Sequence, residues 1–135
     1  MDSIQLTVKT GNRGASVDLT SEAAAYCADR GDGLLSVFVP HATAGIAIYE
    51  TGAGTDTDVL HAIDELLPAD PSHWRHEHGT PGHGRDHVLP AFISPSITIP
   101  VQGGQLMLGT WQSIVLVDTN VDNSTRTVRL SFVTA

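Results

Sequence analysis

The sequence of 135 residues predicts an α+β fold, in which a mainly antiparallel β-sheet or sandwich packs with two helices. Three observations support this class. Short apolar segments with strand-like patterns recur along the chain and dominate its last third. Two segments have helical patterns, and they do not alternate regularly with the strands, as they would in a parallel sheet. The length suits one domain, residues 1–135, with a single core.

The first half of the chain contains four predicted strands and one predicted helix. Apolar and polar residues alternate at the N-terminus, which is typical of a strand with one solvated face. The continuous apolar run before Pro40 favours a buried strand. An Ala-rich helix is expected to begin at Thr20 or Ser21 as its cap and to stop at the glycines of 31–33. The predicted strands span residues 4–9, 17–19, 34–39 and 46–49.

The second half contains the other predicted helix, a long loop and four more strands. Val59, Leu60, Ile63, Leu66 and Leu67 form a one-sided apolar stripe at helical spacing, and Pro68 ends it. From Pro68 to about residue 85 the helical pattern is absent, and Pro, Gly and His predominate. This predicts a long loop, and loops of this length are often functional. The remaining predicted strands span residues 97–101, 105–108, 113–119 and 126–133, with Gly103 and Gly104 in a hairpin turn.

Charge and composition exclude several classes of partner. The chain has 15 acidic and 7 basic residues, and its formal net charge of −8 would repel nucleic acid and anionic membrane surfaces. The same charge suits capture of a cation, but is also ordinary for a soluble protein. Cys27 is alone, so an intrachain disulfide and a Cys-rich zinc site are impossible. With no signal peptide and no apolar run of about 20 residues, a cytoplasmic location is expected.

Histidines provide the strongest chemical signal. Five of the seven lie in the predicted loop: His73, His76, His78, His83 and His87. Neutral imidazoles gathered in this way could bind zinc, or they could belong to a solvated polar loop, and the spacing alone does not decide between the two. The spacing of His83 and His87 would place both rings on one face of a helix, but Gly82 and Gly84 make a helix there unfavourable.

Three segments resemble the signatures of a known family. They are Val39–Gly45 (VPHATAG), Thr98–Val101 (TIPV) and Leu108–Gln112 (LGTWQ). The chain is similar over nearly its whole length to the YjbQ family, also called secondary thiamine-phosphate synthases. In that family a His-Thr-Thr-Ala motif opens a strand ending in Asn-Glu, and here the corresponding strand starts at His41 and ends at Glu50.

Other family positions can be matched one by one. Asp58 matches an Asp of the following helix, His76 the His of a Tyr-x-His motif, and His87 the closing His. The chain also departs from the pattern: Ala42 replaces Thr, Tyr49 replaces Asn, His83 stands where Asn is usual and Asp118 where Glu is usual. The family's Gly-Pro-Arg turn has become residues 120–124, with Arg126 as its remnant.

The resemblance implies a homotrimer that has a metal in a pocket at or near the subunit boundaries. It also implies a reaction that joins a hydroxymethylpyrimidine pyrophosphate to a thiazole phosphate. On this basis we expect His41, His76 and His87 to bind a divalent metal, with His83 as the next candidate. Zinc suits these ligands, and Mg²⁺ would suit a pyrophosphate substrate.

The remaining expected site residues have roles in catalysis and in binding a small-molecule substrate. Glu50 and Asp58 are the expected catalytic acids, and Trp111, Gln112 and Arg126 the expected substrate contacts. The alternative role for Trp111 is that of a core anchor. Two alternative functions stay open: a metal-dependent hydrolase with Glu50 or Asp58 as base, and a non-catalytic trimer that binds a metal or other ligand.

Overall fold

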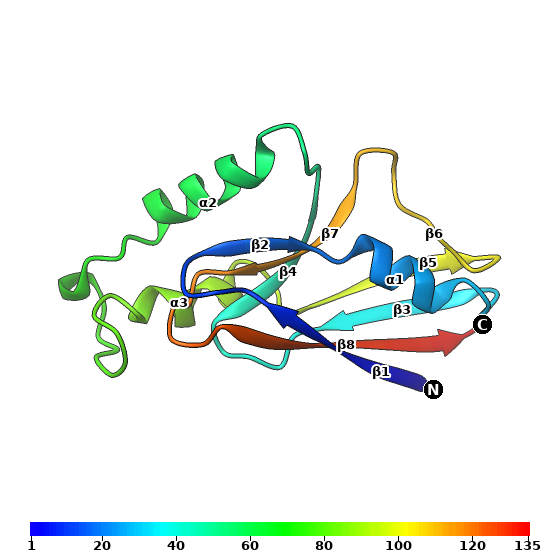
Figure 1. Ribbon diagram of the computed structural model, residues 1–135, viewed down its shortest axis with the longest axis horizontal. Coiled ribbons are helices and arrows are strands. Elements are labelled where there is room, and N and C mark those ends of the chain that lie inside the picture. Colours follow the sequence, from blue (N-terminus) through cyan, green and yellow to red (C-terminus); the bar gives the residue numbers. More distant parts are fainter.

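The computed structural model describes residues 1–135 and confirms the α+β class with mainly antiparallel sheets (Figure 1). The strands are β1 (Asp2–Lys9), β2 (Ala15–Asp18), β3 (Gly33–Phe38), β4 (Ala44–Tyr49), β5 (Ser96–Gln102), β6 (Gln105–Leu106), β7 (Ser113–Asp118) and β8 (Thr125–Thr134). The helices are α1 (Thr20–Cys27), α2 (Thr55–Leu66) and α3 (Gly84–Val88), with short 3₁₀ turns η1 (Pro71–His73) and η2 (Leu89–Ala91). The third helix, α3, was not expected.

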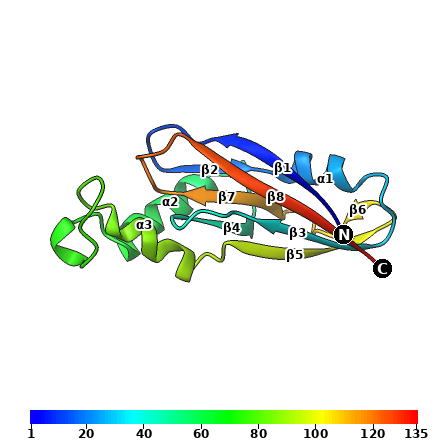
Figure 2. The same cartoon turned by 90° about the horizontal axis from the view of Figure 1, so that it is seen from below.

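The strands form two antiparallel sheets. The larger has the order β1-β8-β3-β5-β6, and the smaller has the order β2-β7-β4. The long pairing of β1 with β8 runs from Asp2 opposite Phe132 to Lys9 opposite Thr125, so the two ends of the chain lie in neighbouring strands. Both termini lie at one end of the molecule, and the long loop with α3 lies at the other (Figures 1 and 2).

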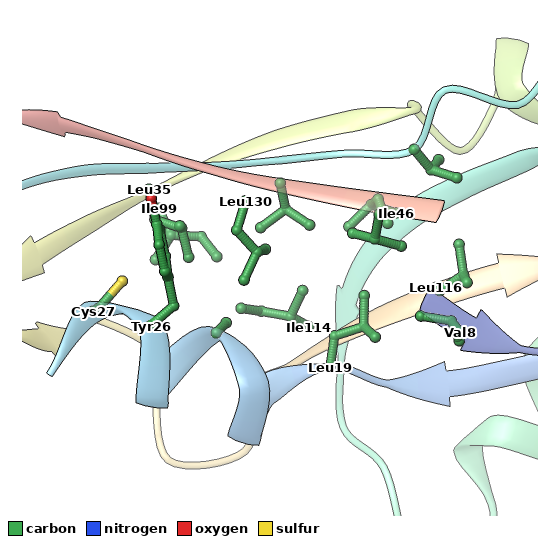
Figure 3. Close-up of a cluster of buried hydrophobic side chains, with 14 of the residues drawn as sticks. Val8, Leu19, Tyr26, Cys27, Leu35, Ile46, Ile99, Ile114, Leu116 and Leu130 are labelled. Atoms are coloured by element: carbon green, nitrogen blue, oxygen red, sulfur yellow. The ribbon is translucent and has the colours of Figure 1, made fainter. Parts of the chain in front are cut away.

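The main core lies between the two sheets and α1. It gathers Leu35, Ile99 and Leu130 from the larger sheet with Ile46, Ile114 and Leu116 from the smaller, as Figure 3 shows. Helix α1 contributes Ala23, Tyr26 and Cys27, and Cys27 is fully buried, as expected for a packing residue. Thr20 and Ser21 do not cap this helix; the Thr20 hydroxyl instead accepts a hydrogen bond from the Ile114 amide at 2.9 Å.

A second, smaller core supports the end of the molecule that carries the long loop and α3. Val115 and Val117, whose neighbours Ile114 and Leu116 face the main core, point the other way and pack with Ile63, Leu67 and Leu89. Helix α2 and the turn η2 therefore cover the outer face of β7. None of the helices is both long enough and apolar enough to span a membrane.

Candidate metal centre

The segment between α2 and α3 is held by local hydrogen bonds. The indole nitrogen of Trp74 donates to the Pro68 carbonyl at 2.7 Å, and Asp70 caps η1 by accepting from the Ser72 amide at 3.0 Å. At its far end, Arg85 donates to the Leu67 carbonyl at 3.2 Å and pairs with Asp64 at 2.6 Å. These contacts bring α3 back against the C-terminal end of α2.

The glycines that made a helix unfavourable around His83 instead permit close packing there. A side-chain carbon at Gly84 would lie 2.7 Å from the Cβ of Trp74, and one at Gly82 would lie 2.1 Å from the carbonyl oxygen of Ala69. Gly82 also has a φ of +85°, which favours glycine. The prediction of no helix was therefore wrong, because tertiary packing outweighs helix propensity at this site. His83 directly precedes α3, and His87 lies within it.

The structure gathers three histidines into one group. Ligand nitrogens of His76, His83 and His87 all lie within 4.8 Å of one another. The Nε2 atoms of His83 and His87 are 2.7 Å apart, and the ring centroid of His76 lies 4.1 Å from that of His87. His76 Nε2 is buried without a hydrogen-bond partner. Three converging imidazoles with one unpaired buried nitrogen are a donor set that suits zinc.

The electrostatic setting favours neutral histidines. Burial lowers the pKa of His76, and the neighbouring His78 and His83 lower it further. Burial also lowers the pKa of His87, and His76 and His83 add to the effect. Because a metal binds only to an unprotonated imidazole nitrogen, a lowered pKa keeps these ligands available near neutral pH.

Polar side chains from α3 and the β7–β8 loop lie behind His83. Its Nδ1 atom lies 2.8 Å from Asn120 Nδ2, 3.1 Å from Asp122 Oδ2 and 3.4 Å from Asp86 Oδ2. Asp86 is buried and accepts a hydrogen bond from the Thr119 hydroxyl at 2.6 Å. Of these three neighbours only Asn120 forms a hydrogen bond with His83, and since its NH₂ group is the donor, Nδ1 is the acceptor.

Arg126 was expected to contact substrate. It lies inside the polar network behind His83 and is buried. It is 2% exposed, forms an ion pair with the buried Asp118, and donates from Nη2 to Asn120 Oδ1 at 3.2 Å. Its charge is therefore already matched inside the protein, and it joins the site only through Asn120.

His41 does not belong to the histidine group, in contrast to the expected ligand set. Its Nε2 accepts a hydrogen bond from the Thr127 amide at 2.9 Å, so that lone pair is already used. Burial lowers the pKa of His41, and the nearby Arg126 lowers it further. The group that the structure forms therefore contains His83 and not His41.

Four further expected site residues lie apart from the histidines. Glu50 and Asp58 are exposed, and they flank the start of α2, whereas the histidines follow its end (Figure 1). Trp111 and Gln112 lie in the β6–β7 loop, far along the molecule from α3 (Figure 1). Trp111 is 72% exposed and so does not anchor the core. Gln112 closes its own turn by accepting from the Gly109 amide at 2.7 Å.

Two hollows are each lined by one histidine of the group, the larger by His76 and the smaller by His83. One, of about 340 Å³, is lined by Pro71, Ser72, His76, Glu77, Gly79, Thr80, Pro81 and Gly82. The other, of about 130 Å³, is lined by Ala69, Thr80, Pro81, Gly82, His83, Arg85, Asp86, Thr119 and Val121. Their walls are mostly small or polar, which suits a compact polar ligand better than a large apolar one.

Sequence reasoning missed the residues that support His83. The spacing of His83 and His87 did contain a signal, because residues four apart share a helix face. Asp86, between them, could have been noted as a carboxylate on the same short segment. Asn120 and Asp122 carried no such signal, since they are more than thirty residues away in the chain.

Comparison with known proteins places the chain in a family. The sequence profile described as UPF0047 protein YjbQ-like matches residues 4–135. UPF0047 protein Rv2556c of Mycobacterium tuberculosis is 59% identical over 133 residues, which are 98% of each chain. A hypothetical protein of Aeropyrum pernix K1 is 33% identical, with a TM-score of 0.88 over 100% of each chain. A protein of unknown function from Sulfolobus solfataricus P2 has a TM-score of 0.90 at 26% identity, covering 99% of this chain and 97% of that one. The chain therefore belongs to the YjbQ-like UPF0047 family.

Proposed function

We propose that this chain is a metal-binding protein in which His76, His83 and His87 hold one divalent ion, with zinc as the best fit. The observation that carries the proposal is the buried, unpartnered Nε2 of His76 beside the facing Nε2 atoms of the other two histidines. Three histidines would hold the ion and leave room for a water or substrate ligand, as in catalytic zinc sites. When bound, the ion supplies a Lewis acid that polarises a phosphoryl or carbonyl oxygen.

As the reaction of this centre we propose formation of thiamine phosphate, as a secondary activity. The family resemblance supplies the substrates, and the polar hollows beside His76 and His83 are compatible with phosphate-bearing ligands. Two arginines around the centre are already paired, Arg85 with Asp64 and Arg126 with Asp118, whereas Arg75, next to His76 in the chain, is exposed. One exposed arginine cannot balance the charge of a departing pyrophosphate, so divalent cations would have to meet most of it, which predicts a requirement for Mg²⁺ in the assay.

Metal analysis followed by activity assays tests this function. Protein purified without chelators is expected to contain one zinc ion per chain at pH 7.5 and to lose it as the pH falls, because protons compete with the ion for the imidazole nitrogens. Incubation with the pyrimidine pyrophosphate, the thiazole phosphate and Mg²⁺ should then give thiamine phosphate, and treatment with a chelator should remove the activity. Purified protein that contains no metal would contradict the proposal that this chain binds a metal ion.

The same assay separates the alternative functions. A metal-loaded protein that fails to couple the precursors but cleaves members of a phosphate-ester panel would be a hydrolase. Glu50 and Asp58 would then need to act from a neighbouring subunit, since within one chain they lie at the other end of α2. A metal-loaded protein inactive in both assays would be a metal-binding module.

We also propose that the protein forms a homotrimer with the metal centre close to a subunit boundary. Leu66 and Phe92 are 78% and 76% exposed, and they rim an apolar groove completed by Ile63, Leu67, Leu89 and Ile93. Large exposed apolar side chains gathered in one place are typical of interaction sites. The groove adjoins α3, which carries His87. The outward-facing residues of the apolar run Ile114–Val117 are covered by α2 within the chain, so this run is not available for association.

Sedimentation at micromolar concentration checks the assembly. The expected result is a single species at three times the chain mass of 14.3 kDa. Replacement of Phe92 by Ser should shift this species toward the monomer, whereas the same change at Met107, another exposed apolar residue outside the groove, should not. A monomer in the unmodified protein would rule out the trimer and any site shared between chains.

A further inference from the structure

We propose that Asn120, in the β7–β8 loop, is a positioning residue that makes the metal centre bind its ion less tightly. By donating a hydrogen bond to Nδ1 of His83, it selects the tautomer whose Nε2–H group points at His87. The effect on affinity rests on the proposed metal binding. The tautomer is a property of the metal-free protein, so it can be tested without an ion.

The orientation of the Asn120 amide follows from its hydrogen-bond partners. Its Oδ1 accepts from the backbone amides of residues 122 and 123, at 2.9 and 3.2 Å, and from Nη2 of Arg126 at 3.2 Å. A rotated amide would turn its NH₂ group toward these three donors, and all three bonds would be lost. In the observed orientation the NH₂ group has two acceptors, His83 Nδ1 at 2.8 Å and Asp86 Oδ2 at 3.4 Å.

This orientation decides which nitrogen of His83 carries a hydrogen. Nδ1 accepts from Asn120, so a neutral imidazole has its one hydrogen on Nε2. That Nε2 lies 2.7 Å from Nε2 of His87, to which it donates. Asn120 is 1% exposed and the His83 side chain 9%, so little water competes with these bonds. Oxygens of Asp122 and Asp86 lie 3.1 and 3.4 Å from Nδ1, but no hydrogen bond joins either to His83.

The tautomer leaves only one of the three ligand nitrogens free. Nε2 of His83 has no lone pair to offer, and the lone pair on Nε2 of His87 accepts its hydrogen. Nε2 of His76 alone has no partner. For His83 to bind an ion, the hydrogen must pass from Nε2 to water while Nδ1 takes one from water, with no net release of protons. The new Nδ1–H group then faces the NH₂ group of Asn120, so their hydrogen bond is lost and zinc affinity is lower by its free energy.

Long-range ¹H–¹⁵N correlation spectra of the metal-free protein test the tautomer, because protonated and unprotonated ring nitrogens have well-separated ¹⁵N shifts. At about pH 8.5, where imidazoles are neutral, we expect the hydrogen of His83 on Nε2. The His83→Gln variant identifies the signals of this residue. In Asn120→Asp an oxygen replaces the NH₂ group, and the hydrogen should move to Nδ1. Hydrogen on Nδ1 in the unmodified protein would overturn the proposal, whether or not the protein binds zinc.

Zinc affinity of the Asn120 variants tests the consequence, with competition by a chromophoric chelator as the measurement. Asn120→Asp should bind zinc about tenfold more tightly than the unmodified protein, the effect of about one hydrogen bond. Asn120→Ala removes the donor without adding a charge, and a smaller rise is expected. This second variant also provides the test if the buried carboxylate of the first prevents folding. Unchanged or lower affinity in the variants that fold would overturn the proposal.

Two controls separate positioning from a general loosening of the β7–β8 loop. Thr119 is 4% exposed and donates to Asp86, so Thr119→Val should lower stability while zinc affinity changes by less than about threefold. In a His83→Gln background, Asn120→Ala should no longer raise affinity. An equal rise in Thr119→Val, or an undiminished rise in that background, would overturn the positioning role while leaving metal binding intact. If the unmodified protein binds no zinc, the proposed function fails, and the spectra still decide the tautomer.

Discussion

Replacement of His87 by Ala is expected to abolish stoichiometric zinc binding. His87 is the central member of the group, since its ring lies 4.1 Å from that of His76 and 4.6 Å from that of His83. Its loss leaves two ligands, and we expect the affinity to fall by more than the roughly 100-fold upper range seen for outer-shell changes. The measurement is zinc content per chain after dialysis, with chelator competition for the residual affinity.

Matched histidine variants show whether the effect is specific. His61→Ala and His73→Ala remove exposed imidazoles on α2 and η1, and zinc content should stay at the level of the unmodified protein. His41→Ala and His83→Ala decide between the two ligand sets. Loss of zinc in the His83 variant with retention in the His41 variant supports the group formed in the structure. The opposite pattern would restore the set expected from the family motif.

Replacement of Arg126 by Ala is expected to lower the free energy of unfolding by about 3–5 kcal/mol, the range seen when one partner of a buried ion pair is removed. Arg126 and Asp118 are 2% and 0% exposed, so the variant leaves a carboxylate inside the protein without its cation. It also removes a donor to Asn120 and so loosens the support of His83. Urea unfolding of the metal-free protein measures the change.

A control on the same strand tests the explanation. Arg129 in β8 is exposed and donates to the Ser3 hydroxyl at 2.9 Å, so Arg129→Ala should cost less than about 1 kcal/mol. Replacing both Asp118 and Arg126 by apolar residues of similar size should recover much of the lost stability, because no uncompensated charge remains. An Arg126→Ala protein with unchanged stability but lost substrate binding would instead favour the substrate contact expected from the sequence.

Strands and the first two helices were predictable because local patterns specify them. The alternation at residues 4–8 matches β1, and the apolar stripe that includes Ile63 matches α2. The ends of elements were less well defined: β4 begins at Ala44 and not at Ile46, and α2 begins at Thr55, before its apolar stripe. Partners from other strands complete the hydrogen bonds at such ends, and a single segment does not reveal them.

Helix α3 was missed for a related reason. Its five residues have no apolar periodicity of their own, and Gly84 lowers the intrinsic helix propensity. Contact with Trp74 requires a residue without a side chain at this point, and that requirement appears only when the two segments are packed together. The spacing of His83 and His87 is only a weak pattern in the sequence. In the structure the same packing makes their two rings face each other.

The sequence by itself determined the fold class and the family. Periodicity and turn residues fix where strands can form, and imidazoles concentrated in one segment mark where a metal could bind. Only the tertiary structure decided which histidines meet. His41 and His83 are both plausible ligands in the sequence, but the Thr127 amide occupies one, and the start of α3 directs the other at His87. A ligand set depends on where side-chain nitrogens point in space, and residues distant in sequence, here Asn120 and Thr127, form the hydrogen bonds that set those directions.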